Sequence, residues 1–292
     1  MSFSPEIKRQ KTKTLKVKTS GRMADFITPN FVYGCMGGCR DTFCNVMKYT
    51  YKNVYINDNR EQIVDIVSDH AYEQDRPRVP SHLDATYWTY EIGIFTDIGL
   101  HREALPFDQV FKFFVDHPYA KAVFSSKYLH PWLFVQRVEE KIRIRVCMMP
   151  ESYHRVIEPQ TPPVIQRLED ISKLRKAWYE IDLDFGPVVV GTKNRLEEYR
   201  KLFELIDMII PNRMKPHIQA HVSFLWHNKR QHKRNLQSWH QKAEKLLWRP
   251  HIMQGWRRRV SRYLLDKRKK FMQQRQDLHQ QILPWNQIRW IG

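Results

Sequence analysis

Two kinds of hydrophobic block alternate along residues 24–226. One kind is short and rich in β-branched and aromatic residues, which is typical of buried strands. It occurs at 24–31, 85–96, 120–128, 142–149, 181–190 and 218–226. The block at 142–149 alternates isoleucine or valine with Arg143 and Arg145, so it predicts a strand with one apolar face and one charged face.

Between these strands the apolar residues repeat every three or four positions, which predicts helices. The predicted helices are 60–73, one that starts at Pro106, 131–140, 163–178 and 194–210 with Asn194 as its cap. Strands that alternate with helices over short connections favour parallel β-α-β crossovers. Six units are too few for the eight-fold barrel, so we expect an α/β fold of the partial (β/α)6 TIM-like barrel type.

Beyond residue 226 the pattern changes to basic, mainly helical sequence. Helices are predicted over 233–247 and 260–283, and five of the nine tryptophans fall in 227–292. Aromatic rings among cations can stack on bases while the cations neutralise phosphates. The segment 255–260 (GWRRRV) is the predicted tip of this region. The residues predicted to bind nucleic acid are Trp256, Arg257, Arg258, Arg259 and Arg262.

Charge separates the chain in the same way. The formal net charge is +18, of which residues 1–22 carry +6 and residues 227–292 carry +14, so residues 23–226 are nearly neutral. This distribution predicts three parts: a flexible basic arm at 1–22, a catalytic barrel at 23–226 and a basic nucleic-acid-binding region at 227–292. The alternative is a basic protein whose charge serves only solubility.

Composition limits the compartment and the class of protein. A hydrophobic content of 42% fits a globular protein. We find no apolar run of about 18 residues and no leader with an apolar core, so we expect a cytoplasmic protein that does not span a membrane. Three of the four cysteines are crowded on one loop, which does not resemble a disulfide framework and favours a reducing compartment.

The crowded cysteines lie in the segment 35–44 (CMGGCRDTFC), directly after the first predicted strand. Structural zinc would need a fourth nearby Cys or His, and no histidine has a fitting spacing. Buried structural cysteines on a Gly-rich loop are a further alternative. Three thiolates without a fourth ligand favour a [4Fe–4S] cluster with one open iron, held by Cys35, Cys39 and Cys44. The C-terminal ends of barrel strands, where this loop lies, are where such folds keep their chemistry.

The loop resembles that of the radical S-adenosylmethionine (SAM) enzymes, whose motif is C-x3-C-x2-C with an aromatic residue before the last cysteine. Cys35 and Cys39 are separated by three residues, as in the motif, and Phe43 stands at the position of the aromatic residue. Four residues separate Cys39 from Cys44, whereas the motif has two. The resemblance implies that the three cysteines bind three irons and that SAM binds the fourth. An electron from the cluster would then cleave SAM to methionine and a 5′-deoxyadenosyl radical.

Over most of residues 25–292 the chain is similar to the spore photoproduct lyase family. Six segments carry this likeness: 90–97 (YEIGIFTD), 124–128 (FSSKY), 143–150 (RIRVCMMP), 184–188 (DFGPV), 221–228 (HVSFLWHN) and 284–290 (PWNQIRW). The likeness implies repair of a thymine photoproduct in DNA, and an electron donor such as flavodoxin or ferredoxin. It places Phe43, Glu91, Lys127 and Cys147 near SAM. A buried structural role for Glu91 and a surface ion pair for Lys127 are the alternatives.

Three positions depart from the family pattern. The cysteine that returns a hydrogen in the family has Ile94 in its place, and Phe43 and Asn45 replace the tyrosines beside the third cluster cysteine. Cys147 and Tyr90 are the candidate catalytic replacements, with Tyr87 as a further tyrosine. The sequence therefore supports three hypotheses: a photoproduct lyase, a radical SAM enzyme with another substrate such as RNA, or a nucleic-acid-binding protein whose cluster is structural or lost.

Overall fold

The computed structural model describes residues 6–36, 53–74, 78–102, 107–190, 192–224, 236, 241–247, 253–256, 260–263 and 265–292. Its centre is an eight-stranded sheet with the order β13-β10-β9-β8-β7-β6-β3-β2. The strands are β2 (Lys18–Thr19), β3 (Phe26–Ile27), β6 (Trp88–Glu91), β7 (Ala120–Ser126), β8 (Ile142–Cys147), β9 (Glu180–Val188), β10 (Ile218–Phe224) and β13 (Ile288–Ile291). All neighbours pair in parallel except β2 with β3.

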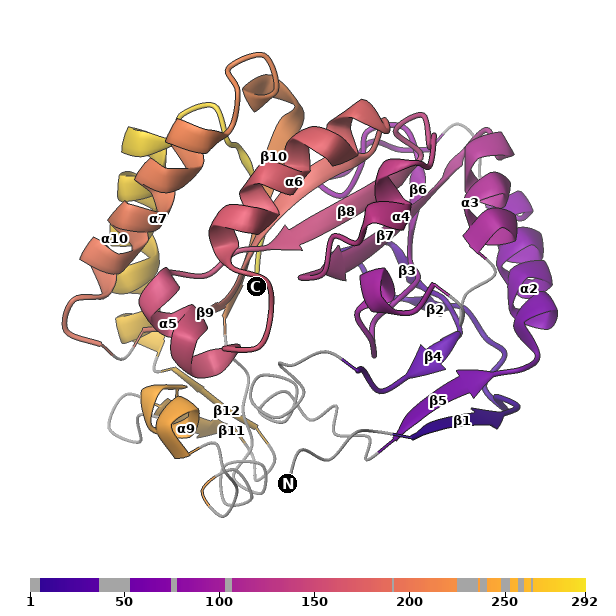
Figure 1. The fold of residues 1–292 in the computed structure, drawn as a ribbon, viewed down its shortest axis with the longest axis horizontal. Coiled ribbons are helices and arrows are strands. Elements are labelled where there is room, and N and C mark those ends of the chain that lie inside the picture. The colour runs from indigo at the N-terminus through magenta and orange to yellow at the C-terminus, as the bar shows by residue number, and fades with distance from the viewer. Residues whose placement is uncertain are drawn as a thin grey trace.

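The six strands expected from the sequence are thus present, parallel and adjacent in chain order, so the predicted partial barrel is confirmed (Figure 1). The helices that flank the sheet are α2 (Arg60–Tyr72), α3 (Phe107–Asp116), α4 (Pro131–Phe134), α5 (Glu151–Ile157), α6 (Val164–Lys176), α7 (Arg195–Ile209) and α10 (Leu265–Ile282). In α3, Phe107, Val110, Phe111 and Phe114 recur at helical spacing and are all buried. The described residues also include two short 3₁₀ helices, η2 (Ile98–Leu100) and η3 (Lys215–His217).

Strands β7, β8 and β9 are buried on both faces, yet only one face is apolar. In β8 the side chains of Ile142, Ile144 and Val146 lie in the hydrophobic core, while Arg143 and Arg145 occupy the alternate positions. Successive side chains of a strand point to opposite faces. The alternation therefore directs a charged row into the barrel interior and an apolar row toward the helices.

Two smaller sheets lie outside the barrel. Strand β5 (Val54–Asn57) pairs with β1 (Ile7–Gln10) on one side and β4 (Val32–Tyr33) on the other. A hairpin of β11 (Met253–Trp256) and β12 (Val260–Tyr263) lies near helix α9 (Gln241–Leu247), as Figure 1 shows. None of the helices in the described part of the chain combines the length and the apolar character needed to cross a bilayer.

The N-terminal arm, whose flexibility stays a prediction, contains two short strands. Residues of β1 pair with β5, and β2 pairs with β3 at the edge of the large sheet. Side chains add to this, since Arg9 donates to Asp58 at 3.0 Å. Strand β1 pairs with a strand remote in sequence, which periodicity within the segment itself could not indicate, whereas β2 pairs with the nearby β3.

The C-terminal region is not separate from the barrel. Strand β13 pairs with β10 inside the large sheet, and α10 packs against α7. The expected boundary at residue 226 stays a prediction, although β13 extends the large sheet beyond β10 and so joins the end of this region to the barrel.

Three predicted helices have other bounds. The helix expected over 131–140 ends at Phe134, because the next residues pair with the turn after α6, where Val138 N donates to Ala177 O. The helix expected from residue 260 begins at Leu265, since 260–263 form β12. Asn194 precedes α7 but makes no side-chain capping bond.

Candidate active site

Five polar side chains occupy the interior faces of the sheet near the C-terminal ends of its strands. We call them the rim cluster: Glu91 of β6, Lys127 after β7, Arg145 and Cys147 of β8, and Asp184 of β9. All five are buried. Parallel pairing brings them together, because Cys147 lies opposite Asp184 in the register of β8 and β9. The C-terminal ends of parallel strands are the ordinary place for active sites in barrels of this kind.

Cys147 is a thiol at neutral pH. Burial raises its pKa to about 12, and Asp184 and Glu158 add to that effect while Lys127 opposes it. Such a thiol keeps its hydrogen and is a poor metal ligand, since the thiolate is the ligating form. A role as a metal ligand is therefore not favoured for Cys147.

Asp184 has an open acceptor. One carboxylate oxygen, Oδ2, accepts a long hydrogen bond from Ser125 Oγ at 3.4 Å. The other oxygen, Oδ1, is buried and has no hydrogen-bond partner among the described residues. Buried polar atoms are nearly always paired. An orphaned carboxylate oxygen in the barrel interior is therefore a position where a ligand can place an N–H or O–H group.

Glu91 is engaged by a neighbour in the cluster. Its Oε2 atom accepts from Arg145 Nη2 at 2.5 Å, and Arg145 also donates to Ser125 Oγ at 2.9 Å. Burial raises the pKa of Glu91, and the Arg145 guanidinium offsets part of that rise. This arrangement favours the structural alternative for Glu91 over direct contact with SAM.

The backbone beside Lys127 is fixed by Asp97. Asp97 accepts from Lys127 N at 2.7 Å, from Ser126 Oγ at 2.6 Å and from Gly99 N at 3.1 Å. Gly99 packs so closely on the next segment that a Cβ atom there would lie 1.9 Å from Tyr128 O. Asp97 and Gly99 together join the loop after β6 to the loop after β7 and so set the position of Lys127.

A second set of charges fills the opposite end of the barrel, where the strands begin. We call it the base cluster, and it consists of Asp84, Lys121, Arg143, Glu180, Asp182 and Arg289. Arg143 donates to Asp84 at 2.5 Å and to Glu180 at 2.8 Å, and Arg289 donates to Glu180 at 2.7 Å. Lys121 also pairs with both acids. Three cations and three carboxylates thus compensate one another.

The pKa values of the acids at the base reflect this compensation. Burial alone would raise the pKa of Asp84, but Lys121 and Arg143 outweigh it and lower that pKa to about 2. Asp182 behaves in the same way: despite burial, a hydrogen bond from His221 and the charge of Arg143 lower its pKa. The base cluster is a charge-compensated network at one end of the barrel.

Cys35 is the one predicted cluster ligand that the structure describes, and it is buried. The residue before it, Gly34, has a φ of 85° and donates its N–H to Phe95 O at 3.2 Å. The rings of Tyr33 and Phe95 stack with centroids 5.6 Å apart. Both contacts hold the start of the cysteine loop against the loop after β6, on the rim side. Cys39, Phe43 and Cys44 lie outside the described residues.

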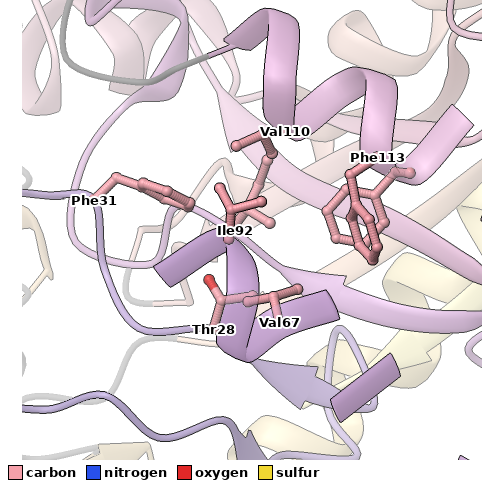
Figure 2. A pocket seen from close by; sticks show the side chains of 8 residues that line it. Thr28, Phe31, Val67, Ile92, Val110 and Phe113 are labelled. Carbon is pink, nitrogen blue, oxygen red and sulfur yellow. The ribbon is translucent and has the colours of Figure 1, made fainter. Parts of the chain in front are cut away.

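Tyr90 does not join the rim cluster. It is fully buried on the opposite face of β6, where its hydroxyl lies 3.0 Å from His70 Nδ1 and its ring packs on Phe26 and Phe114. The apolar pocket of Figure 2 lies on the same helix side of the sheet, lined by residues such as Val67, Ile92 and Phe113. A hydrogen donor for a substrate in the barrel interior is not expected at this position.

The residues predicted to bind nucleic acid fall on or beside the β11–β12 hairpin. Trp256 ends β11 and pairs with Val260, and Arg262 lies on β12 opposite Gln254. Arg257, Arg258 and Arg259, which connect the two strands, lie outside the described residues. That this segment forms a tip that binds nucleic acid stays a prediction.

Asp184, Arg145 and the base cluster were missed from the sequence as a site. The signal was present: residues 180–185 read EIDLDF, with acids at every second position, just as 142–147 read IRIRVC. When two neighbouring strands both alternate between charged and apolar residues, pairing places their charged side chains side by side on one face of the sheet. The register that matches Arg143 with Glu180 and Cys147 with Asp184 decides which charges meet.

Comparison with known proteins gives one consistent answer. The sequence pattern of the family described as "Spore photoproduct lyase" matches residues 9–283. Among solved structures, the chain is similar to spore photoproduct lyase complexed with dinucleoside spore photoproduct, at a TM-score of 0.82 and 18% identity. It is also similar to a double mutant with bound AdoMet and dinucleoside spore photoproduct, at a TM-score of 0.81 and 17% identity. Each likeness covers 98% of this chain and 82% of the other. No curated protein sequence matches it.

Proposed function

Because the chain belongs to the spore photoproduct lyase family and is thus an enzyme of the radical SAM lyase type, we propose that it repairs a thymine photoproduct in DNA. The main support for this proposal is that several candidate functional side chains lie at the same end of the barrel. Cys35 lies beside the loop after β6, while Lys127, Cys147 and Asp184 face the interior at the same strand ends. A ligand bound there would touch a metal-bearing loop and a polar rim together.

The residues present fit the two groups that this activity needs. A [4Fe–4S] cluster would be held by Cys35, Cys39 and Cys44, and the thiolates suit iron in such clusters. SAM carries an amino group, a carboxylate and ribose hydroxyls. Lys127 offers a cation for the carboxylate, and the orphaned Asp184 Oδ1 offers an acceptor for an N–H or O–H group. When bound, the cluster and SAM together supply a radical that removes a hydrogen from the substrate.

Cys147 is the proposed source of the hydrogen that returns to the product. The thiol stays protonated well above neutral pH, so a transferable hydrogen is present at Sγ. Ile94, at the family's usual place for a hydrogen-donating cysteine, has no such hydrogen. Of the two candidate replacements, Cys147 shares the barrel interior with Asp184, whereas Tyr90 faces the helices.

DNA binding is assigned to the basic region around the β11–β12 hairpin. Residues 227–292 carry a formal charge of +14, and in the sequence Trp256, the last residue of β11, is followed directly by three arginines. A planar side chain among cations can wedge between base steps while the cations contact phosphates. Each phosphate contact releases counterions, so we expect affinity for DNA to fall steeply between low and physiological salt. A salt-independent affinity would contradict this assignment.

The first experiment is anaerobic reconstitution with iron and sulfide. We expect a brown protein that binds three or more irons and cleaves SAM when a reductant, or an electron donor of the flavodoxin or ferredoxin class, is added. Cys44→Ala is expected to abolish cleavage, with Cys147→Ala as the matched control that keeps it. Absence of SAM cleavage in the reconstituted wild-type protein would favour the binding-only hypothesis.

The second experiment identifies the substrate. We expect an oligonucleotide that contains the thymine photoproduct to be restored to two thymines, and Cys147→Ala to lower the yield of restored thymine while SAM is still cleaved. Active SAM cleavage without restored thymine would reject the lyase assignment. Modified RNA substrates would then be tested, as the alternative radical SAM activity requires.

A further inference from the structure

The backbone carbonyl of Cys147 lies where the pairing between β7 and β8 stops. Ala122 N donates to Lys141 O at 3.0 Å, and in a parallel pair this bond recurs at regular spacing along the two strands. Continued past Ser126, the series would join Tyr128 N to Cys147 O. Tyr128 N instead donates to Ser126 Oγ at 3.0 Å. Since Cys147 is buried and a buried carbonyl needs a donor, that donor comes from outside the sheet.

Arg167, in the first turn of α6, is this donor. Its Nη1 atom donates to Cys147 O at 2.8 Å. Its Nε atom donates to Pro162 O at 2.9 Å, and its Nη2 atom donates to Thr161 Oγ1 at 2.6 Å. Nη2 also lies 2.9 Å from a carboxylate oxygen of Glu158. One side chain therefore joins the end of β8 to the loop between α5 and α6.

The guanidinium of Arg167 is itself held in place. Arg167 and Glu158 are each 1% exposed, and their opposite charges compensate each other. Thr161 Oγ1, which accepts from Arg167, donates to Glu158 O at 2.9 Å. Because the guanidinium is planar and all three of its nitrogens have a partner, a shift of the group would break several bonds at once. The carbonyl of Cys147 is thereby fixed relative to α6.

We propose that Arg167 is a positioning residue that fixes the thiol of Cys147 for hydrogen transfer to the substrate. The inference rests on the proposed function, in which Cys147 returns the hydrogen. In that transfer the S–H bond breaks, a C–H bond forms on the thymine and the unpaired electron moves to sulfur. The hydrogen bond from Arg167 holds the backbone that carries the thiol. A displacement of about 1 Å near a reacting group can cost about a hundredfold in rate.

The test counts thymines restored for each SAM cleaved by the reconstituted enzyme, acting on a photoproduct oligonucleotide in deuterated water. Thiol hydrogens exchange with solvent, so hydrogen returned by Cys147 appears as deuterium in the restored thymine and is measured by mass spectrometry. We expect Arg167→Met to lower the ratio about tenfold, because the thiol is misplaced. The deuterium content of the remaining product should fall too. A smaller amount of folded enzyme would change neither quantity.

A double-mutant cycle shows whether Arg167 acts through Cys147. If it does, adding Arg167→Met to Cys147→Ala lowers the ratio no further. Lys173→Met is the matched control on α6, since Lys173 pairs with Asp170 at 2.7 Å and its side chain is half exposed. For this control we expect the ratio and the deuterium content of wild type.

Arg167→Lys replaces Arg167→Met if the latter does not fold. It keeps a cation beside Glu158, but one ammonium nitrogen cannot span the acceptors that the guanidinium fork joins. We expect a ratio below that of wild type, and again no further loss when Cys147→Ala is added.

The failures are distinguishable. Suppose that wild type restores thymine and that the loss from Arg167→Met persists in full in the Cys147→Ala background: the positioning role is then overturned and the proposed function stands. An unchanged ratio in Arg167→Met, or an equal loss in Lys173→Met, has the same meaning. Restored thymine without solvent deuterium in wild type rejects Cys147 as the donor, and the inference with it. Wild type that cleaves SAM but restores no thymine overturns the proposed function itself.

Discussion

The two ends of the barrel interior are built from the same strands and from the same alternation of side chains, yet they differ in how their charges are paired. At the base, every cation contacts a carboxylate, with Arg143 at 2.5 Å from Asp84 and 2.8 Å from Glu180. At the rim, Asp184 accepts only a long hydrogen bond from Ser125 at 3.4 Å among the described residues, whereas Asp182 at the base accepts from His221 at 2.8 Å and lies 3.3 Å from Arg289 Nε. A carboxylate that lies close to cations stabilises the fold, whereas one with a single long hydrogen bond is suited to bind a ligand.

The largest effect should come from opening the base cluster. Arg143→Met removes a cation that contacts both Asp84 and Glu180, and leaves two buried carboxylates with fewer partners. Breaking a buried pair in this way costs about 3–5 kcal/mol. We expect a loss of this size in the free energy of unfolding, measured by urea denaturation.

Lys112→Met is the matched surface control. Lys112 pairs with Asp116 at 2.6 Å, but both side chains are more than half exposed, so the cost should be at most about 0.5 kcal/mol. If Arg143→Met lowered the free energy of unfolding by less than 1 kcal/mol, the base cluster would not be a main source of the barrel's stability.

The pH dependence of stability gives the second test. The pKa of Asp84 is lowered to about 2 in the folded protein, below its usual value of about 3.9. Its contribution is therefore fully present above pH 4 and is lost as the pH falls through 2. We expect Asp84→Asn to cost about 2 kcal/mol at pH 7, and this difference from wild type should shrink between pH 4 and pH 2.

Unfolding curves of wild type and Asp84→Asn at matched pH values measure this difference directly. Because other carboxylates titrate in the same range, only the difference between the two proteins is informative. A difference that is constant from pH 7 down to pH 2 would show that ionised Asp84 does not stabilise the base.

The third prediction concerns the rim. Asp184→Asn removes a charge whose Oδ1 atom has no hydrogen-bond partner among the residues described, so the free energy of unfolding should change by less than about 1 kcal/mol. Affinity for SAM should fall about tenfold, because an N–H or O–H group of SAM loses a charged acceptor. A loss in the free energy of unfolding as large as that of Arg143→Met would show that the rim stabilises the fold as much as the base does.

The smallest effect is expected from a residue that belongs to neither cluster. Tyr90→Phe removes the hydroxyl that lies 3.0 Å from His70 on the helix side of β6, and the lost hydrogen bond should cost about 1 kcal/mol. SAM cleavage and the yield of restored thymine should be unchanged. Loss of product with SAM cleavage retained would instead make Tyr90 a hydrogen donor.

Much of the fold was predictable from periodicity. Strands that alternate with amphipathic helices give parallel crossovers, and the order of the six strands follows from short connections. Pairing by remote segments was not predictable. Strands β1 and β13 are short and lie in basic sequence, and what orders them is a partner far away in the chain: Val54 for Ile7, and Ala220 for Ile288.

The site was predictable in its chemistry but not in its contacts. Family likeness selected Cys147 and Lys127, and both lie at the rim. It could not show that Glu91 is engaged by Arg145, that Asp184 has an open oxygen, or that Arg167 holds the carbonyl of Cys147. These facts depend on the register of neighbouring strands and on loop conformations, which a single sequence does not specify.

Arg289 has a consequence for how the protein is made. It reaches Leu83 O from 206 positions away, and it pairs with Glu180, which lies 109 positions earlier. Domains fold from the N-terminus during synthesis. The carboxylates of the base cluster therefore stay incompletely neutralised until β13, which carries Arg289, has been synthesised. A chain that stalls before this strand would retain excess buried negative charge, and proteases that cut partly unfolded proteins should remove it first.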